Sequence, residues 1–125
     1  MTDGSAAPQV ILVVEDDQLL RLVTVDMVEE AGFVALEAGS ADEAVVILES
    51  RSDIALVLTD VEMPGSMDGI KLAHAVRHRW PPIKIIVVSG RMCPLDVDLP
   101  VYSRFFGKPY GTDALISGIG SLIGR

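Results

Sequence analysis

Acidic residues stand directly after two apolar runs of this sequence. Glu15, Asp16 and Asp17 follow the run VILVV, and Asp60 follows the run ALVLT. Short continuous apolar runs rich in β-branched residues are typical of strands that are buried on both faces. Carboxylates that collect at strand ends resist ionising together unless a cation neutralises them. The pattern predicts a cation site, although Asp17 alone also fits a helix cap and Asp60 alone also fits a turn.

A hydroxyl and an ammonium follow two further apolar runs. Ser89 ends the run IKIIVVS, and Lys108 follows the residues FFG. In a parallel α/β sheet, ligands bind beyond the carboxyl ends of the strands, so these groups are expected to meet the acids there. Oxygen ligands favour Mg²⁺, while a lysine and a hydroxyl suit the oxygens of a phosphoryl group. With its charge offset in this way, an aspartate is an adequate nucleophile towards phosphorus.

Strand patterns and helix patterns alternate along the chain. Such alternation indicates a parallel sheet covered by helices on both faces. Ser40 with Glu43 fits a capping box, and Asp68 is placed to cap the third helix. We expect strands over residues 10–14, 33–36, 55–59, 83–88 and around 105–106, and helices over 18–32, 41–51, 68–80 and 112–123.

The segment from Gly90 to Ser103 interrupts this alternation. A helix should lie there, yet Pro94 and Pro100 fall inside it and no 3.6-residue apolar period survives. We therefore expect an irregular loop or at most one helical turn.

The composition limits the class of protein. The chain has 125 residues with 18 acids against 10 bases, a net charge of −8, which argues against nucleic-acid binding by bulk charge. The length suits one domain over residues 1–125, with residues 1–8 as a flexible tail. No apolar run approaches the ~20 residues of a membrane helix, and the start lacks a signal peptide's positive region. The single cysteine, Cys93, excludes an internal disulfide, so we expect a soluble cytoplasmic protein.

Four stretches, in order, resemble the receiver domains of bacterial two-component response regulators. They read ILVVEDD, LVLTDVEMPGSMDG, IIVVSG and FFGKPY, and together they span nearly the whole chain. The resemblance implies a flavodoxin-like α/β fold, a five-stranded parallel sheet in the order 2-1-3-4-5 flanked by helices. Here the fourth helix is expected to be shortened or replaced by a loop.

The resemblance also assigns roles to the residues at the strand ends. Asp60 would be the phosphoacceptor, charged by a histidine kinase or a phosphotransfer protein. Asp17 would bind Mg²⁺ directly, Asp16 would assist through water, and Asp60 and the backbone carbonyl of Glu62 would complete the protein ligands. Lys108 would pair with the phosphoryl charge.

Two switch positions and several departures from the family pattern follow from the same comparison. Ser89 would bond a phosphoryl oxygen and move on activation, and Phe105 occupies the aromatic switch position without the hydroxyl of the commoner tyrosine. The Lys108–Pro109 bond stands where the family often has a cis peptide. Ser66 lengthens one loop by a residue, and the Glu62 carboxylate is an added charge expected to alter the phosphoryl lifetime, with Gly90 leaving a path for water.

The expected function is a phosphorylation-dependent signalling switch, not an enzyme acting on a pool of substrate. No output domain is expected in this chain, and no direct contact with nucleic acid or membrane. The chain is then either a stand-alone receiver that works through protein contacts or a fragment of a longer regulator or hybrid kinase. Gly118 and Gly120 in the last helix suggest a weak homodimer. Two alternatives stay open: a pseudo-receiver that only binds partners, and a phosphohydrolase with an aspartyl nucleophile.

Overall fold

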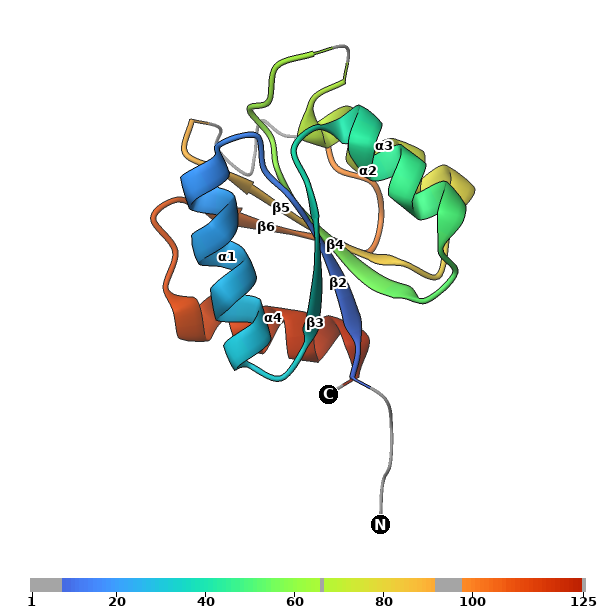
Figure 1. Ribbon diagram of the computed structural model, residues 1–125. Coiled ribbons are helices and arrows are strands. Elements are labelled where there is room, and N and C mark those ends of the chain that lie inside the picture. The colour runs from blue at the N-terminus through green and yellow to red at the C-terminus, as the bar shows by residue number, and fades with distance from the viewer. Residues whose placement is uncertain (1–7, 66, 92–97, 125) are drawn as a thin grey trace.

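Five parallel strands alternate with four helices in the part of the chain that the computed structural model describes, residues 8–65, 67–91 and 98–124 (Figure 1). The sheet order is β3-β2-β4-β5-β6, which is 2-1-3-4-5 in chain order, and every neighbouring pair is parallel, so the predicted fold is confirmed. The elements are β2 (Val10–Val14), α1 (Gln18–Glu30), β3 (Val34–Ala38), α2 (Ala41–Ser50), β4 (Ile54–Asp60), α3 (Gly69–Arg79), β5 (Lys84–Ser89), β6 (Ser103–Gly107) and α4 (Thr112–Ile123).

Helices cover both faces of the sheet (Figure 1). Along β2, Ile11 and Val13 pack with α1 and α4, whereas Leu12 and Val14 pack with α2 and α3. Successive side chains of a strand point to opposite faces, so a central strand that is apolar at every position supplies both cores at once. Packing on both faces therefore holds the sheet in place, and with it the positions of the carboxyl ends of its strands.

The strands end later than the apolar runs alone suggest. β4 includes Asp60 and β5 includes Ser89, because the parallel ladder pairs Asp60 with Val88 and Ser89 with Gly107. Phe33, expected to begin the second strand, instead donates its backbone N–H to the carbonyl of Val28 in the turn after α1. The predicted site residues Asp60 and Ser89 thus belong to the sheet itself and not to loops.

Side-chain caps begin three of the helices. Asp68 accepts a hydrogen bond from the backbone N–H of Lys71, as predicted for the start of α3. Ser40 accepts from the N–H of Glu43, and the Glu43 carboxylate accepts from the N–H of Gly39, one residue before the position that a standard capping box uses. Asp17 caps α1 through the N–H of Leu20.

No helix forms among the described residues between β5 and β6, namely 90, 91 and 98–102. Residues 98–102 instead lie against α3, where His74 Nε2 is 2.7 Å from the carbonyl of Asp98 and an Arg77 nitrogen donates to the carbonyl of Tyr102 at 3.4 Å. The predictions for the tail, Ser66, Cys93 and Pro94 concern residues 1–7, 66 and 92–97, which lie outside the described residues.

One glycine of α4 lies against the sheet. Gly118 and Gly120 are buried, and a Cβ at Gly118 would lie 2.7 Å from Cζ of Phe106. Gly118 lets α4 approach β6 closely, and the weak homodimer expected from the sequence stays a prediction. Among the described helices, none combines the length and the apolar character needed to cross a membrane.

Candidate functional site

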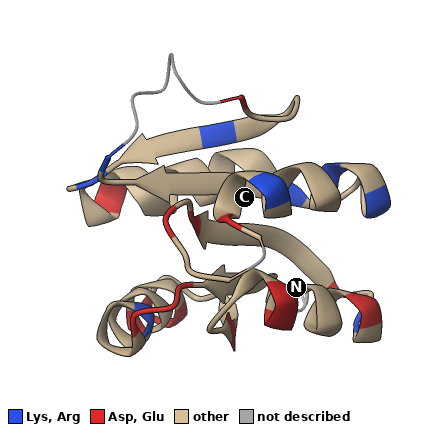
Figure 2. Cartoon of the chain, turned by 90° about the horizontal axis from the view of Figure 1, so that it is seen from above, with Lys and Arg blue, Asp and Glu red and all other residues tan. Residues whose placement is uncertain are grey.

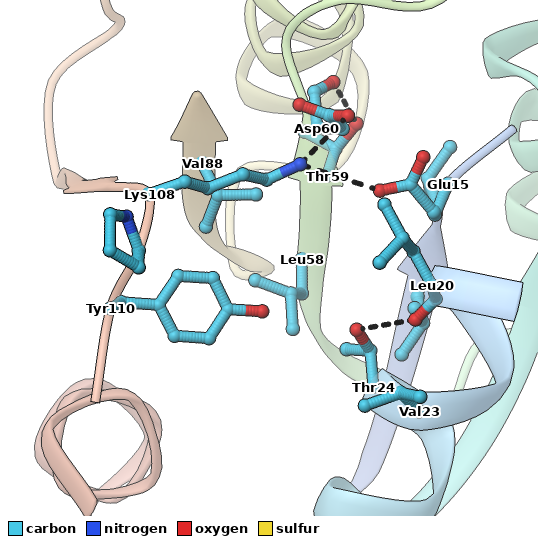
Figure 3. Close-up of a pocket in the computed structure, with 13 residues that line it drawn as sticks. Glu15, Leu20, Val23, Thr24, Leu58, Thr59, Asp60, Val88, Lys108 and Tyr110 are labelled. Atoms are coloured by element: carbon cyan, nitrogen blue, oxygen red, sulfur yellow. Dashed lines mark hydrogen bonds and ion pairs between the residues drawn. The ribbon is translucent and has the colours of Figure 1, made fainter. Parts of the chain in front are cut away.

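The carboxyl ends of the central strands bring one aspartate, one glutamate and one lysine together (Figure 3). Asp60 is the last residue of β4 and is 6% exposed, and Glu15 directly follows β2. The two residues are level because Val14 pairs with Thr59 in the sheet. Lys108 follows β6, and its side chain extends across the strand ends towards both acids.

Three carboxylates form one cluster at this edge. Oxygen atoms of Glu15, Asp16 and Asp60 lie within 4.8 Å of one another, with Glu15 and Asp60 buried and Asp16 exposed. Seen from above, acidic residues gather at the ends of the central strands (Figure 2). Asp60 Oδ1 is buried and has no hydrogen-bond partner among the described residues.

Lys108 is the cation that faces this cluster. Its Nζ donates to Asp60 Oδ2 at 3.2 Å and lies 3.7 Å from Glu15 Oε1. Burial acts to lower the Lys108 pKa, but the hydrogen bond and charge of Asp60, together with the charge of Glu15, outweigh it and leave the pKa raised. The backbone N–H of Lys108 donates to the carbonyl of Ser89 at 2.8 Å, and the Lys108–Pro109 peptide is cis, as the resemblance implied.

The carboxyl group of Glu15 has a raised pKa. Burial raises the pKa of its carboxyl from 4.5 to about 7, and the charge of Asp60 adds to the rise, while the backbone N–H of Asp17 and the charge of Lys108 oppose it. One lysine therefore does not neutralise the three carboxylates of the cluster.

The donor set fits a hard divalent cation. Carboxylate oxygens are the ligands that Mg²⁺ prefers, and Mg²⁺ sites in proteins often use one or two carboxylates together with water and phosphate. Asp60 Oδ1, buried and unpartnered within the described chain, supplies an oxygen whose desolvation such an ion would offset. Glu15, Asp16 and Asp60 are the side chains that could hold the ion.

The carboxylate cluster differs at one position from the set of metal ligands expected from the sequence. Asp17, expected as the direct ligand, is absent from the cluster and caps α1 through Leu20 N at 3.0 Å. Glu15, which had no assigned role, takes its place. The backbone N–H of Glu15 still bonds to the carbonyl of Ala38 at the end of β3, so its side chain stays level with Asp60. The position of Glu15 directly after an apolar run is the feature of the sequence that could have identified it.

Arg21 is a supporting residue that the sequence did not reveal. Its guanidinium donates to the backbone carbonyl of Glu15 at 2.9 Å and to Glu37 Oε1 at 3.1 Å. The side chain thereby ties the turn between β2 and α1 to the end of β3. This contact holds the backbone from which the Glu15 and Asp16 carboxylates project.

The remaining predicted residues lie on the neighbouring strands. Ser89 is 1% exposed, and its Oγ donates to Glu62 Oε2 at 2.6 Å. Phe105 is partly buried in β6, beside Val87 of β5, and packs against the core on the α2 and α3 side. No metal contact of the Glu62 carbonyl and no movement of Phe105 is tested by this structure, so both stay predictions.

A pocket of about 410 Å³ opens beside the acids, between α1 and the residues after β6 (Figure 3). Its walls include Leu20 and Val23 of α1, Leu58 of β4, and Tyr110. The acids and Lys108 are therefore reached along an apolar cleft.

Comparison with known proteins agrees with this geometry. Residues 11–100 match the family described as response regulator receiver domain. The chain is 30% identical over 116 residues to the response regulator receiver protein CpdR of Brucella abortus, covering 90% of this chain and 95% of that protein. It is 31% identical over 118 residues to the autoinducer sensor kinase/phosphatase CqsS of Vibrio cholerae, covering 90% of this chain and 17% of CqsS.

A solved structure extends the comparison to the fold. The response regulator TrrA of Thermotoga maritima, crystallised in complex with Mg²⁺ and BeF, is similar with a TM-score of 0.81 at 27% identity, covering 91% of this chain and 98% of that chain. The chain spans 13–24% of the length of the first three curated relatives that it matches.

Proposed function

The chain belongs to the response regulator receiver domain family of two-component signalling, and we propose that it is a switch that accepts a phosphoryl group on Asp60. The arrangement of Asp60 is the observation that carries this proposal. Its carboxylate is buried at a strand end, one oxygen is held by Lys108, and the other has no partner within the described residues. Lys108 thereby offsets the charge of a buried carboxylate that is placed to act as a nucleophile.

In the proposed step, a carboxylate oxygen of Asp60 attacks the phosphorus of a phosphohistidine. The O–P bond forms as the P–N bond breaks, and the electron pair of the P–N bond stays on the imidazole nitrogen, which takes up a proton. Lys108, 3.2 Å from Asp60 Oδ2, is placed to pair with the added phosphoryl charge. Later attack of water breaks the O–P bond and returns Asp60 with inorganic phosphate.

Glu15 and Asp16 would hold Mg²⁺ together with Asp60. A bound Mg²⁺ would supply positive charge that reduces the repulsion between the acids and an incoming phosphoryl group. Buried Glu15 and exposed Asp16 approach Asp60 from the end of β2. Because Arg21 anchors the backbone of Glu15, these side chains would be positioned before the donor arrives.

Incubation with Mg²⁺ and acetyl phosphate, followed by intact-protein mass measurement, tests the acceptor. We expect a single phosphoryl increment in the wild type and at least a tenfold smaller modified fraction in Asp60→Asn, because the neutral amide is a far poorer nucleophile than the carboxylate. Asp53→Asn, at an exposed acid just before the amino end of β4, is the matched control and should be modified like the wild type. Equal modification of Asp60→Asn contradicts the assignment.

Two other outcomes would favour the alternatives. Mg²⁺ binding without modification by acetyl phosphate or by phosphohistidine donors would indicate a pseudo-receiver. Sustained release of phosphate from an ester, lost in Asp60→Asn, would indicate a phosphohydrolase.

The donor is proposed to dock on α1. Four aliphatic side chains of this helix stay exposed: Leu19 at 69%, Leu20 at 47%, Leu22 at 59% and Val23 at 59%. Leu20 and Val23 also line the pocket that leads to Asp60 (Figure 3). An apolar helix face beside the acceptor suits a helical domain of a histidine kinase or a phosphotransfer protein.

A double variant with serine in place of both Leu19 and Leu22 should distinguish docking of the donor from phosphorylation of Asp60 itself. We expect phosphotransfer from phosphorylated histidine phosphotransfer proteins to slow at least tenfold, while modification by acetyl phosphate stays within twofold of the wild type. Val46→Ser, at a 64% exposed aliphatic residue of α2, is the control and should change neither rate. Equal slowing with both donors would show that α1 acts on the acceptor itself and not on docking.

A further inference from the structure

The hydroxyl of Ser89 is engaged by a carboxylate. Ser89 Oγ donates to Glu62 Oε2 at 2.6 Å and accepts from the backbone N–H of Arg91 at 3.1 Å. A serine hydroxyl has one hydrogen to donate, and a short bond to a charged acceptor is among the stronger hydrogen bonds in proteins. In this state, the Ser89 hydrogen is therefore directed to Glu62.

The backbone keeps these two residues together. Val61, between Asp60 and Glu62, donates its N–H to the carbonyl of Val88 at 2.9 Å and accepts from the N–H of Gly69 at 3.0 Å. The start of the loop after β4 is thus fixed to β5 and to α3. This anchoring places Glu62 beside Ser89.

We propose that Glu62 is a latch that holds Ser89 in the unphosphorylated state and competes with the phosphoryl group for its hydroxyl. This inference rests on the proposed function of Asp60. A phosphoryl group on Asp60 can receive the Ser89 hydrogen only if the bond to Glu62 breaks. The free energy of the Ser89–Glu62 bond then destabilises the phosphorylated state relative to the unphosphorylated state. Because Arg91 N–H also bonds to Ser89 Oγ, release of the hydroxyl would reach the segment that follows β5.

A second mechanism by which Glu62 could act is simple charge repulsion. A carboxylate two residues from the acceptor opposes an incoming anion whether or not Ser89 is present. The two mechanisms differ in one respect, since only the latch requires the Ser89 hydroxyl. A double-mutant cycle on Glu62 and Ser89 therefore separates them.

The experiment titrates Mg²⁺-dependent beryllofluoride, a phosphoryl mimic, against four proteins by ¹⁹F NMR: wild type, Glu62→Gln, Ser89→Ala and the double variant. We expect Glu62→Gln to bind the mimic about tenfold more tightly than the wild type, a change of ~1.4 kcal/mol. In the Ser89→Ala background the same change should alter the affinity less than twofold. Glu30→Gln, which removes an exposed acid of α1, is the charge-matched control and should bind like the wild type.

Each result decides between stated possibilities. A Glu62→Gln effect of equal size with and without Ser89 would overturn the latch in favour of charge repulsion, and the proposed function would stand. No change on Glu62→Gln in either background would also overturn the latch. Failure of all four proteins to bind the mimic would contradict the proposed function, and the latch would fall with it.

Discussion

Replacing Gly69 with alanine is expected to destabilise the protein by about 3 kcal/mol or more. A Cβ at this position would lie 1.9 Å from the carbonyl oxygen of Asp60 and 2.9 Å from Cα of Val61. Both contacts are to backbone, which cannot move aside as the end of a long side chain can. To relieve them, α3 would have to withdraw from the end of β4 and disrupt the bond from Gly69 N–H to the carbonyl of Val61.

Urea denaturation followed by circular dichroism measures this effect. Gly111→Ala is the control, because Gly111 has no atom within 4 Å of an added Cβ and a negative φ of −79°. Its free energy of unfolding should stay within about 1 kcal/mol of the wild type. A Gly69→Ala protein as stable as Gly111→Ala would show that α3 does not hold the acceptor strand closely. If Asp60 accepts phosphate as proposed, its phosphorylation should also decrease in Gly69→Ala, because the clash is with the backbone of Asp60.

The metal-free protein is expected to lose stability as the pH rises from about 4.5 to about 7. Burial raises the Glu15 pKa to about 7 in the folded state, against 4.5 for the ordinary carboxyl. Between these values, the folded protein holds a proton that the unfolded chain has released, so the free energy of unfolding falls as the pH increases. The full shift corresponds to a loss on the order of 3 kcal/mol above pH 7, with nothing lost below pH 4.5.

Urea denaturation of wild type and Glu15→Gln at pH 4.5, 6 and 8 isolates this contribution. The glutamine is neutral at every pH, so the variant should match the wild type at pH 4.5 and exceed its stability at pH 8. Glu29→Gln, at an exposed acid of α1, should follow the wild type throughout. Saturating Mg²⁺ at pH 8 should stabilise the wild type more than Glu15→Gln, since the ion would neutralise the ionised carboxylate. Parallel curves for wild type and Glu15→Gln would contradict the assignment of Glu15 as the titrating group.

Much of the fold could be predicted from the sequence because its signals are local. A continuous apolar run such as 10–14 indicates a strand buried on both faces, and Asp68 marked the start of α3 without knowledge of the rest of the chain. Pro94 and Pro100 likewise led to the expectation of no regular helix after β5, and none occurs in the described residues there. The strand order came from resemblance to a family, since local pattern does not determine which strands are neighbours.

The positions of Asp60 and Lys108 at the carboxyl ends of strands could also be predicted from the sequence. Both follow apolar runs, and parallel strands place such residues at one edge of the sheet. Their meeting at 3.2 Å is the structural outcome of that rule.

Only the tertiary structure decided which carboxylates join them. Glu15, Asp16 and Asp17 are consecutive acids, and the resemblance to the family assigned Mg²⁺ binding to Asp16 and Asp17 and no role to Glu15. Which of these acids lies beside Asp60 depends on where the sheet ends. The backbone of Glu15 still bonds to Ala38 of β3, whereas Asp17 already caps α1. The bond between Ser89 and Glu62 joins residues 27 positions apart, and the contact of Gly69 with Asp60 depends on how α3 docks on β4. Local propensity carries no information on such contacts, because they arise only when separate elements pack together.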